Sequence, residues 1–497
     1  MSGYGAMAID TGIDTTRNRF PEAGKGLSVT DVLAATGGTL LSGNESAVFD
    51  SVEIDSRTFP PGALFVAIRG EKHDGHAFLA EVIRQGARGV LVDDETIIRK
   101  TAFQSVAGET ACITVSDTTR ALGDLAAYQR RQADIRVVAI TGSNGKTTTR
   151  CMTAAVFGRR FNTLASPGNF NNEIGLPLTL FRIKPRHQWA VVELGMNHFN
   201  EIRRLSAICR PDIGIITTIA PCHLAGVGSV EGVVKAKSEL LENIRSGGTV
   251  ILNRDDAHLA RLGTRAAMDV LFFGESEKAD IRARSIRETP GGIDFVLELP
   301  GSRTPVRLPA VGRFMVVNAL AAAAAGYLAG ISGEEIGEGL SRYCPESGRL
   351  TIVETDRGVT IIDDTYNANP ASMAAAIDTL VNLAGRKRSI LVMGDMLELG
   401  KESGQLHRAT GELAGRSGIS RIYITGTHAD DVAAGARSGG LEKDRIITGE
   451  TKAVIADLKN QLQAGDFLLV KGSRGSAMER VVTPIREWAT EKKPAAK

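Results

Sequence analysis

Residues 138–149, with the sequence VAITGSNGKTTT, constrain the fold of this chain more strongly than any other segment. An apolar run of strand length leads into a turn containing Gly142 and Gly145, and a Lys-Thr pair follows where a helix would begin. In such an arrangement, backbone N–H groups of the turn and of the helix amino end point at anionic oxygens. The segment therefore predicts a phosphate-binding loop between a strand and a helix.

The loop departs from the full GxxxxGK[ST] pattern, because Ile140 stands where the first glycine would be. The alternative is an ordinary Gly/Asn turn before a lysine-bearing helix. The preceding strand and the Lys146–Thr147 pair favour nucleotide binding, since Lys146 supplies a mobile charge and the Thr147 hydroxyl can ligate Mg²⁺. The candidate nucleotide-binding residues of this segment are Thr141, Gly142, Ser143, Asn144, Gly145, Lys146, Thr147 and Thr148.

Apolar runs of strand length alternate with helical segments along most of the chain. They occur at 136–141, 188–194, 212–219, 248–253 and 270–274, and again at 359–364, 389–395, 421–426 and 467–472. Parallel strands need long crossovers, which helices fill, so the alternation predicts α/β parallel sheets with helices on both faces. Ligands should then gather at the carboxyl ends of the strands.

The length of 497 residues indicates about three domains at ~150 residues each. We expect a loose extension at 1–26, a small α/β domain at 27–115, a central domain at 116–343 and a second doubly wound domain at 344–497. The Ala-rich stretch 315–331 is interrupted by Asn318 and falls short of the ~20 apolar residues of a spanning helix. We interpret it as a packed helix.

Composition excludes several classes of function. Lys plus Arg is 59 against 57 for Asp plus Glu, and the net charge of +2 gives no field that would favour nucleic acid or a membrane as partner. The five cysteines lack CxxC spacing, which argues against a disulfide framework or a zinc site. Residues 1–26 contain no apolar run of a signal peptide. We expect a cytoplasmic monomer that acts on a small charged substrate.

Two polar residues are associated with apolar runs that come after the predicted loop in the sequence. Glu193 ends the run QWAVVEL, so its carboxylate should lie at the same sheet edge and could hold a metal ion. His223 follows the next run and should land nearby. The alternatives are a buried structural glutamate and a hydrogen-bonded loop histidine.

Three motifs together resemble the Mur ligase family: TGSNGKTT at 141–148, ELGMNHFNEI at 193–202, and His223 followed by AKSEL at 236–240. Further matches are DSR at 55–57, KHDGHAF at 72–78, GNFNNEIGLP at 168–177, LNRDD at 252–256, GRL at 348–350 and DDTYNANP at 363–370. The resemblance runs from about residue 27 to 480 and implies three α/β domains: one for a UDP-sugar, a central P-loop ATPase with a parallel sheet, and a C-terminal Rossmann-like sheet.

Within the family, NFNNEIGLP and DTYNANPASM are similar to the members that add D-alanyl-D-alanine to UDP-N-acetylmuramoyl tripeptide. The resemblance implies ATP-dependent ligation through an acyl phosphate, giving the UDP-linked pentapeptide used in peptidoglycan synthesis. Diaminopimelate and lysine stay open as the third residue of the peptide. The rival interpretations are another Mur or folate-type carboxylate–amine ligase, and a P-loop regulator that does not ligate.

The resemblance also implies catalytic and metal-binding residues. Lys146 and Thr147 match residues for the ATP phosphates and a first Mg²⁺, and Glu193 and His223 match ligands of a second Mg²⁺. Lys237 matches a carbamylated lysine, whose carbamate would add an oxygen ligand; the alternative is a solvated helix lysine. Lys146, His223 and Lys237 are thus the expected catalytic residues, and no general base is assigned.

Other residues match nucleotide or substrate contacts. For ATP they are Asn253, Asn318, Arg349 and Asp364; for the other substrates they are Ser56, Arg57, Asn169, Asn171, Asn172, Asn367 and Asn369. Lys471 and Arg474 match residues that close on nucleotide and incoming dipeptide. Phe314 and Met315 depart from the family's GRHNxxN pattern, and an apolar wall for adenine could serve in their place. From the residues alone, each polar group here could equally be structural.

Overall fold

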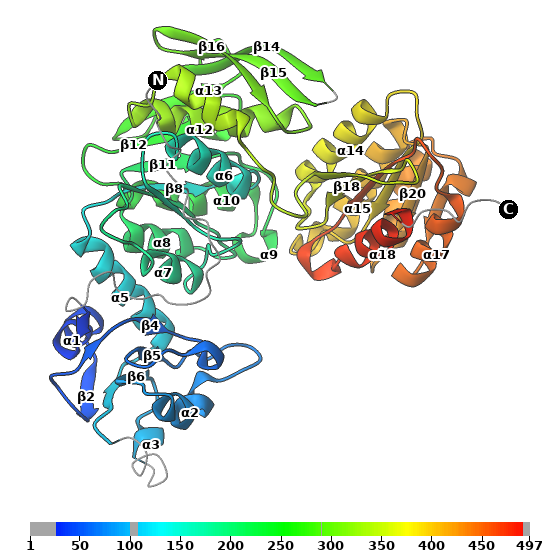
Figure 1. Cartoon of the computed structure of the whole chain (residues 1–497). Coiled ribbons are helices and arrows are strands. Elements are labelled where there is room, and N and C mark those ends of the chain that lie inside the picture. Colours follow the sequence, from blue (N-terminus) through cyan, green and yellow to red (C-terminus); the bar gives the residue numbers. More distant parts are fainter. Residues whose placement is uncertain (1–25, 100–107, 290, 491–497) are drawn as a thin grey trace.

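The computed structural model describes residues 26–99, 108–289 and 291–490 and arranges them in three α/β lobes (Figure 1). The N-terminal lobe has a five-stranded sheet of order β2-β7-β6-β5-β4, parallel except for β2 against β7. Its strands are β2 (Thr39–Ser42), β4 (Val52–Glu53), β5 (Leu64–Val66), β6 (Gly89–Val92) and β7 (Ala111–Thr114), and its helices are α1 (Val29–Thr36), α2 (Leu79–Arg84) and α3 (Glu95–Ile98). A short antiparallel pair, β1 (Leu27–Ser28) with β3 (Val48–Phe49), completes it.

Helix α5 (Thr118–Gln132) joins this lobe to the central one (Figure 1). Its apolar face carries Leu122 and Leu125, both fully buried. These residues belong to one apolar cluster that includes Val32 of α1 and Leu205 of α8 (Glu201–Cys209) in the central lobe. The core is therefore continuous across this junction.

The central lobe is built on a nine-stranded sheet of order β16-β15-β14-β13-β12-β11-β8-β10-β9. Its strands are β8 (Arg136–Thr141), β9 (Thr163–Ala165), β10 (Trp189–Glu193), β11 (Ile213–Ile216), β12 (Thr249–Asn253), β13 (Asp269–Gly274), β14 (Ile281–Thr289), β15 (Gly292–Leu299) and β16 (Ser302–Leu308). Its remaining helices are α6 (Lys146–Phe157), α7 (Gly175–Leu180), α9 (Leu224–Val227), α10 (Val230–Ser238), α11 (Ala257–Gly263), α12 (Phe314–Leu328) and α13 (Gly333–Ser341).

The seven strands from β8 to β14 are parallel to one another, which confirms the predicted α/β class. At the edge of the sheet, β15 pairs antiparallel with both β14 and β16. The predicted parallel sheet thus continues into an antiparallel edge that the sequence did not indicate. In β14, buried Ile281 and Ala283 alternate with the partly exposed Arg282 and Arg284. That alternation is typical of an antiparallel strand with one solvated face.

The predicted packed helix is α12, whose alanines from Ala319 to Ala325 are buried. Small side chains allow the helix to lie close to α6 and to the sheet. Within the described residues, no helix is both long and apolar enough to cross a membrane.

The C-terminal lobe contains a six-stranded sheet of order β17-β18-β22-β19-β20-β21, parallel except for the edge strand β17, as expected for a Rossmann-like domain. The strands are β17 (Thr351–Glu354), β18 (Thr360–Asp364), β19 (Ser389–Met393), β20 (Arg421–Ile424), β21 (Ile446–Thr448) and β22 (Phe467–Lys471). The helices are α14 (Pro370–Ala384), α15 (Ser403–Arg416), α16 (Ala429–Ser438), α17 (Thr451–Gln461) and α18 (Glu479–Thr490).

Candidate active site

The loop after β8 has the backbone that a phosphate cradle needs. Gly142 has φ 148° and Gly145 has φ 82°, in the region that side chains disfavour. A Cβ at Gly142 would lie 1.9 Å from the Thr217 Oγ1 atom, and a Cβ at Gly145 would lie 2.2 Å from Asn318 Oδ1. Gly145 precedes the first residue of α6, so the amino end of this helix opens onto the loop.

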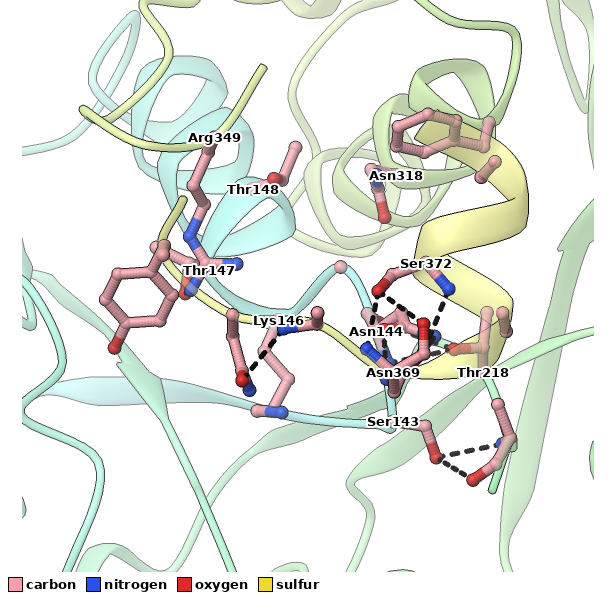
Figure 2. A pocket seen from close by; sticks show the side chains of 18 of the residues that line it. Ser143, Asn144, Lys146, Thr147, Thr148, Thr218, Asn318, Arg349, Asn369 and Ser372 are labelled. Atoms are coloured by element: carbon pink, nitrogen blue, oxygen red, sulfur yellow. Dashed lines mark hydrogen bonds between the residues drawn. The ribbon is translucent and has the colours of Figure 1, made fainter. Parts of the chain in front are cut away.

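Lys146 and Thr147 begin α6 and are held by short polar contacts. The ammonium of Lys146 donates to the Gly142 carbonyl oxygen at 2.9 Å. The Thr147 hydroxyl donates to Glu193 Oε2 at 2.9 Å and accepts from Arg349 Nη2 at 2.7 Å. Figure 2 shows Arg349 reaching from its own segment toward Thr147. Groups from the end of β10 and from the C-terminal lobe thus meet at the Thr147 hydroxyl beside the loop.

Glu193 is 2% exposed at the end of β10, and both of its carboxylate oxygens have partners. Asn171 Nδ2 donates to Oε1 at 2.8 Å, and Thr147 donates to Oε2. The nearest guanidinium nitrogen, Arg150 Nε, is 3.7 Å away. The carboxylate is therefore held by neutral donors that a cation could replace or share.

A cavity of about 630 Å³ lies between the central and C-terminal lobes. Its lining includes these predicted residues: Ser143, Asn144, Gly145, Lys146, Thr147, Thr148, Asn171, Asn172, Glu193, His223, Asn253, Asn318, Arg349, Asp364, Asn367, Asn369 and Lys471. Phe314 and Met315 also line it and give the expected apolar wall. The cavity can take a ligand that has an apolar group against Phe314 and Met315 and an anionic group at the loop.

Two nucleotide candidates, Asn253 and Asn318, are held by hydrogen bonds to neighbouring groups. Asn253, at the end of β12, donates from Nδ2 to the Thr217 carbonyl oxygen at 3.2 Å. Asn318 Oδ1 accepts from the Thr149 hydroxyl at 3.3 Å, so the lone polar residue of α12 faces the loop. Thr141 is fully buried behind the loop and, like Gly142, does not line the cavity.

The C-terminal lobe supplies a buried ion pair. The ammonium of Lys471, a residue 2% exposed, donates to Asp364 Oδ2 at 2.5 Å and to the Asn367 carbonyl oxygen at 2.9 Å. The Arg349 guanidinium lies 4.1 Å from the ring centroid of Tyr366. Burial is the main cause that raises the pKa of Tyr366.

Asn369 lies at the amino end of α14 and reaches the phosphate loop. Its Oδ1 accepts from the Ser372 backbone N–H at 2.9 Å, which caps the helix. Its Nδ2 donates to Asn144 Oδ1 at 2.7 Å, and Asn144 Nδ2 donates back at 3.4 Å. Figure 2 shows this amide pair bridging the loop and α14.

Lys237, on α10, is 1% exposed, which excludes the solvated helix lysine that the sequence left open. Burial lowers the pKa of its ammonium to about 7, with a smaller opposing effect of Cys222 and a further lowering by Lys146. A substantial fraction of the amine is then neutral near pH 7. It is not among the residues that line the cavity.

His223 precedes α9 and has φ 53°, a left-handed backbone. Its Nδ1 lies 2.5 Å from Oε2 of Glu398 in the C-terminal lobe. The hydrogen bond with His223 is the main cause that lowers the pKa of the Glu398 carboxyl. Within the described residues, no group of three His, Cys, Asp or Glu side chains is close enough to hold a metal ion. Glu193 and His223 share the cavity lining without forming such a cluster.

The remaining substrate candidates lie away from the cavity or contact only their neighbours. Arg57 in the N-terminal lobe is exposed and pairs with Asp55 at 2.6 Å, and Ser56 beside it is buried. Asn169 is exposed, and Asn172 Oδ1 accepts from the Gly175 N–H at 2.8 Å. The structure therefore does not bring Ser56, Arg57 or Asn169 to the central cavity.

Arg150 was missed by sequence reasoning. It is 2% exposed on α6 and donates to the Ser166 carbonyl oxygen at 2.5 Å. It also forms an ion pair with Glu346, in the segment leading to the C-terminal lobe. Its only sequence signal is an arginine in the second turn after the loop, a place where arginine is usually solvated.

Comparisons with known proteins agree with this architecture. The chain matches the "Mur ligase family, catalytic domain" over residues 48–130, the "Mur ligase middle domain" over 140–326, and the "Mur ligase, glutamate ligase domain" over 348–474. The UDP-N-acetylmuramoyl-tripeptide–D-alanyl-D-alanine ligase of Escherichia coli is 38% identical over 89% of this chain and 94% of its own. The Bacillus subtilis enzyme of the same name is 34% identical over 89% and 94%.

Solved structures give the same result. MurF from Acinetobacter baumannii is 33% identical with a TM-score of 0.84, covering 93% of this chain and 99% of its own. MurF ligase from Thermotoga maritima in complex with ADP is 25% identical with a TM-score of 0.78, covering 89% and 98%. The chain belongs to the Mur ligase family, whose members are ATP-dependent ligases.

Proposed function

We propose that this protein joins D-alanyl-D-alanine to UDP-N-acetylmuramoyl tripeptide with ATP, giving the UDP-linked pentapeptide precursor of peptidoglycan. The observation that carries the proposal is a single cavity in which the phosphate loop of the central lobe faces the Asp364–Lys471 pair of the C-terminal lobe. The similarity to ligases of this name over nearly the whole chain selects the substrates.

The chemistry follows from the difficulty of the reaction. A free carboxylate and an amine do not form an amide at a useful rate, so the tripeptide carboxylate first attacks the γ-phosphorus of ATP and ADP leaves. The amine of the dipeptide then attacks the acyl carbon, and phosphate leaves as the amide forms. Lys146 and the N–H groups at the start of α6 neutralise charge on the transferred phosphoryl group.

The proposal includes two Mg²⁺ ions, and the donors beside the phosphate loop support a cation there. Thr147 and Glu193 bring a hydroxyl and a buried carboxylate together, and oxygen donors of this kind suit Mg²⁺. We assign the first ion to Thr147, and the second to Glu193, His223 and a carbamate on Lys237. Bound Mg²⁺ would offset the negative charge of the ATP phosphates.

The carbamate on Lys237 is supported by burial and by charge. A buried amine whose pKa is near 7 is partly unprotonated at neutral pH and can add carbon dioxide. Carbamylation replaces a buried positive charge by an anionic oxygen ligand. Lys237→Ala should nearly abolish ligation, and acetate or formate in excess should restore part of it. An amine additive should not, and full activity of the variant in bicarbonate-free buffer would contradict the role.

We assign the remaining functions by lobe. Residues 27–115 with Ser56 and Arg57 would bind the UDP-sugar, and residues 116–343 would bind ATP, with Asn169, Asn171 and Asn172 orienting the peptide. Residues 344–497 would hold the dipeptide near Asn367 and Asn369, while Arg349 and Asp364 contact nucleotide. ATP and UDP-linked substrates suit a cytoplasmic monomer without a nucleic-acid or membrane partner.

The decisive experiment is mass analysis of the product made from ATP, D-alanyl-D-alanine and each candidate UDP-tripeptide, containing diaminopimelate or lysine. We expect a pentapeptide product, and ADP release that requires both the tripeptide and the dipeptide. A product formed only from another amine or acid would identify a different ligase. ADP release independent of both substrates would favour a regulatory P-loop protein.

A further inference from the structure

Glu398 connects the C-terminal lobe to the start of α9 in the central lobe. It follows β19 in a loop, and its Oε2 lies 2.5 Å from Nδ1 of His223. The Glu398 carbonyl oxygen also accepts from the Ala225 backbone N–H at 3.2 Å. One residue thus contacts α9 with both its side chain and its backbone, which fixes the approach of the two lobes at this point.

Both residues of the pair have a left-handed backbone. His223 has φ 53° and Glu398 has φ 64°, a region that residues other than glycine rarely adopt. Such conformations persist where surrounding structure holds them, and they are concentrated at functional sites. Here they direct the imidazole and the carboxylate toward each other across the lobe boundary.

The hydrogen bond decides which ring nitrogen of His223 is free. A carboxylate accepts only, so Nδ1 is the nitrogen that donates, and in the neutral imidazole Nε2 then carries the lone pair. In the described part of the chain, no hydrogen bond to Nε2 is formed, and His223 lines the cavity. A histidine that binds a metal generally donates its other N–H to a carboxylate or carbonyl, which sets the tautomer and the ring orientation.

We propose that Glu398 is a positioning residue for the divalent cation: when the C-terminal lobe docks, its carboxylate holds His223 with Nδ1 protonated and Nε2 ready to bind the ion. This inference rests on the proposed metal role of His223. Cation binding and docking of the C-terminal lobe are then coupled reciprocally, because a cation that binds the oriented imidazole more tightly also stabilises the docked lobe. Glu398 itself touches neither the ion nor the reacting atoms.

The test measures Mn²⁺ affinity by electron paramagnetic resonance on the full chain with the β,γ-methylene analogue of ATP. Loss of a carboxylate that orients a metal ligand typically weakens metal binding 10- to 100-fold, so Glu398→Ala should raise the Kd for Mn²⁺ by about tenfold. Glu398→Gln should recover much of the affinity, because its carbonyl oxygen still accepts from Nδ1. Glu402→Ala removes an exposed carboxylate on the same loop and should match the wild type.

A His223→Ala variant separates this inference from the proposed metal site. We expect it to weaken Mn²⁺ binding, and the double variant with Glu398→Ala to be no weaker than His223→Ala alone. If His223→Ala weakens binding and Glu398→Ala does not, the positioning role is refuted while the metal role stands. If His223→Ala binds Mn²⁺ like the wild type, both are refuted. Equal losses in Glu398→Ala and Glu402→Ala would reveal only a general charge effect and would also refute the positioning role.

Discussion

The central lobe meets its two neighbours through interfaces of different character. Toward the N-terminal lobe the contact is mainly apolar: Leu122 and Leu125 of α5 are fully buried in a cluster shared by both lobes, and the Tyr128 hydroxyl of α5 donates to Asp31. Toward the C-terminal lobe, the partly buried Phe314 and Leu406 pack across the boundary, and polar contacts join Arg349 with Thr147, Asn369 with Asn144, and Glu398 with His223. Figure 1 shows α5 as the bridge to the N-terminal lobe, and the C-terminal lobe beside the central one.

The difference indicates which of the two junctions opens at the lower free-energy cost. Separating an apolar junction exposes buried carbon to water, which costs about 25 cal/mol for each Å². Hydrogen bonds across a polar junction are exchanged for hydrogen bonds to water, so each is worth about 0.5–1.5 kcal/mol net, or about 1.5–3 kcal/mol where one partner is charged. We therefore expect the N-terminal and central lobes to behave as one body, with the C-terminal lobe closing on it when substrates bind.

The largest effect should come from a change in the phosphate loop, which borders the polar junction. Lys146→Ala removes the charge nearest the phosphate loop, and loss of such a transition-state contact typically lowers kcat about 10²- to 10³-fold or more. Lys146 is only partly buried, so the melting temperature should stay close to that of the wild type. Coupled-enzyme detection of ADP and a thermal melt measure both. Near-normal turnover in a folded variant would contradict the loop assignment.

The apolar junction should respond in the opposite way. Leu125→Ala leaves a cavity in the shared core and should lower the free energy of unfolding by about 2–5 kcal/mol. Turnover by the protein that stays folded should change little. The matched control is Leu413→Ala on α15, where the leucine is 42% exposed and the loss should be within about 0.5 kcal/mol. Equal destabilisation by the two variants would undermine the view of α5 as a structural bridge.

Lys237 tests whether a buried charge close to the polar junction lowers stability. The pKa of Lys237 is about 7 in the folded protein, against 10.5 for an unburied lysine. Between these pH values the unfolded chain holds a proton that the folded chain lacks. Stability therefore rises with pH across this window, and the full penalty is present below about pH 7. Lys237→Met removes the penalty of burying this charge and should stabilise the protein by on the order of a few kcal/mol at pH 6, and by less at pH 9.5.

The measurement for Lys237→Met is chemical denaturation of both proteins in metal-free and bicarbonate-free buffer, which keeps the lysine unmodified. The gain should shrink as the pH rises through the window. A gain that increases with pH, or one that is absent at pH 6, would show that the ammonium is not desolvated in the folded state.

The sequence could predict the parts of the site that local pattern controls. The strand before Gly142 and the Lys146–Thr147 pair after Gly145 specify the loop, since only glycine fits where Thr217 and Asn318 approach. Register then brings Glu193 opposite Ile140 on the neighbouring strand. The order of strands along a parallel sheet thus places both residues at one edge.

What the sequence could not predict depends on contacts between distant segments. Arg150 and Glu346 are 196 residues apart, and His223 and Glu398 are 175 apart, so no spacing rule connects them. The burial of Lys237 has the same origin, because a lysine on a short helix is usually solvated. Strands β14 to β16 were missed because runs such as IRARSIRET are too polar to register as core strands.

The smallest effect, and the most direct comparison of the two junctions, is a change of distance without a change of stability. Dyes on cysteines at Arg265 and Lys443 report on the central and C-terminal lobes, and a pair at Arg265 and Glu45 reports on the central and N-terminal lobes. The exposed Cys344 is first replaced by serine. On addition of the ATP analogue and UDP-tripeptide, energy transfer should change for the first pair by an amount equivalent to a few Å, because closure excludes water from the acyl phosphate. The second pair should not respond, since its lobes share one apolar core. Equal responses from the two pairs would mean that the character of the interface does not decide which lobe moves.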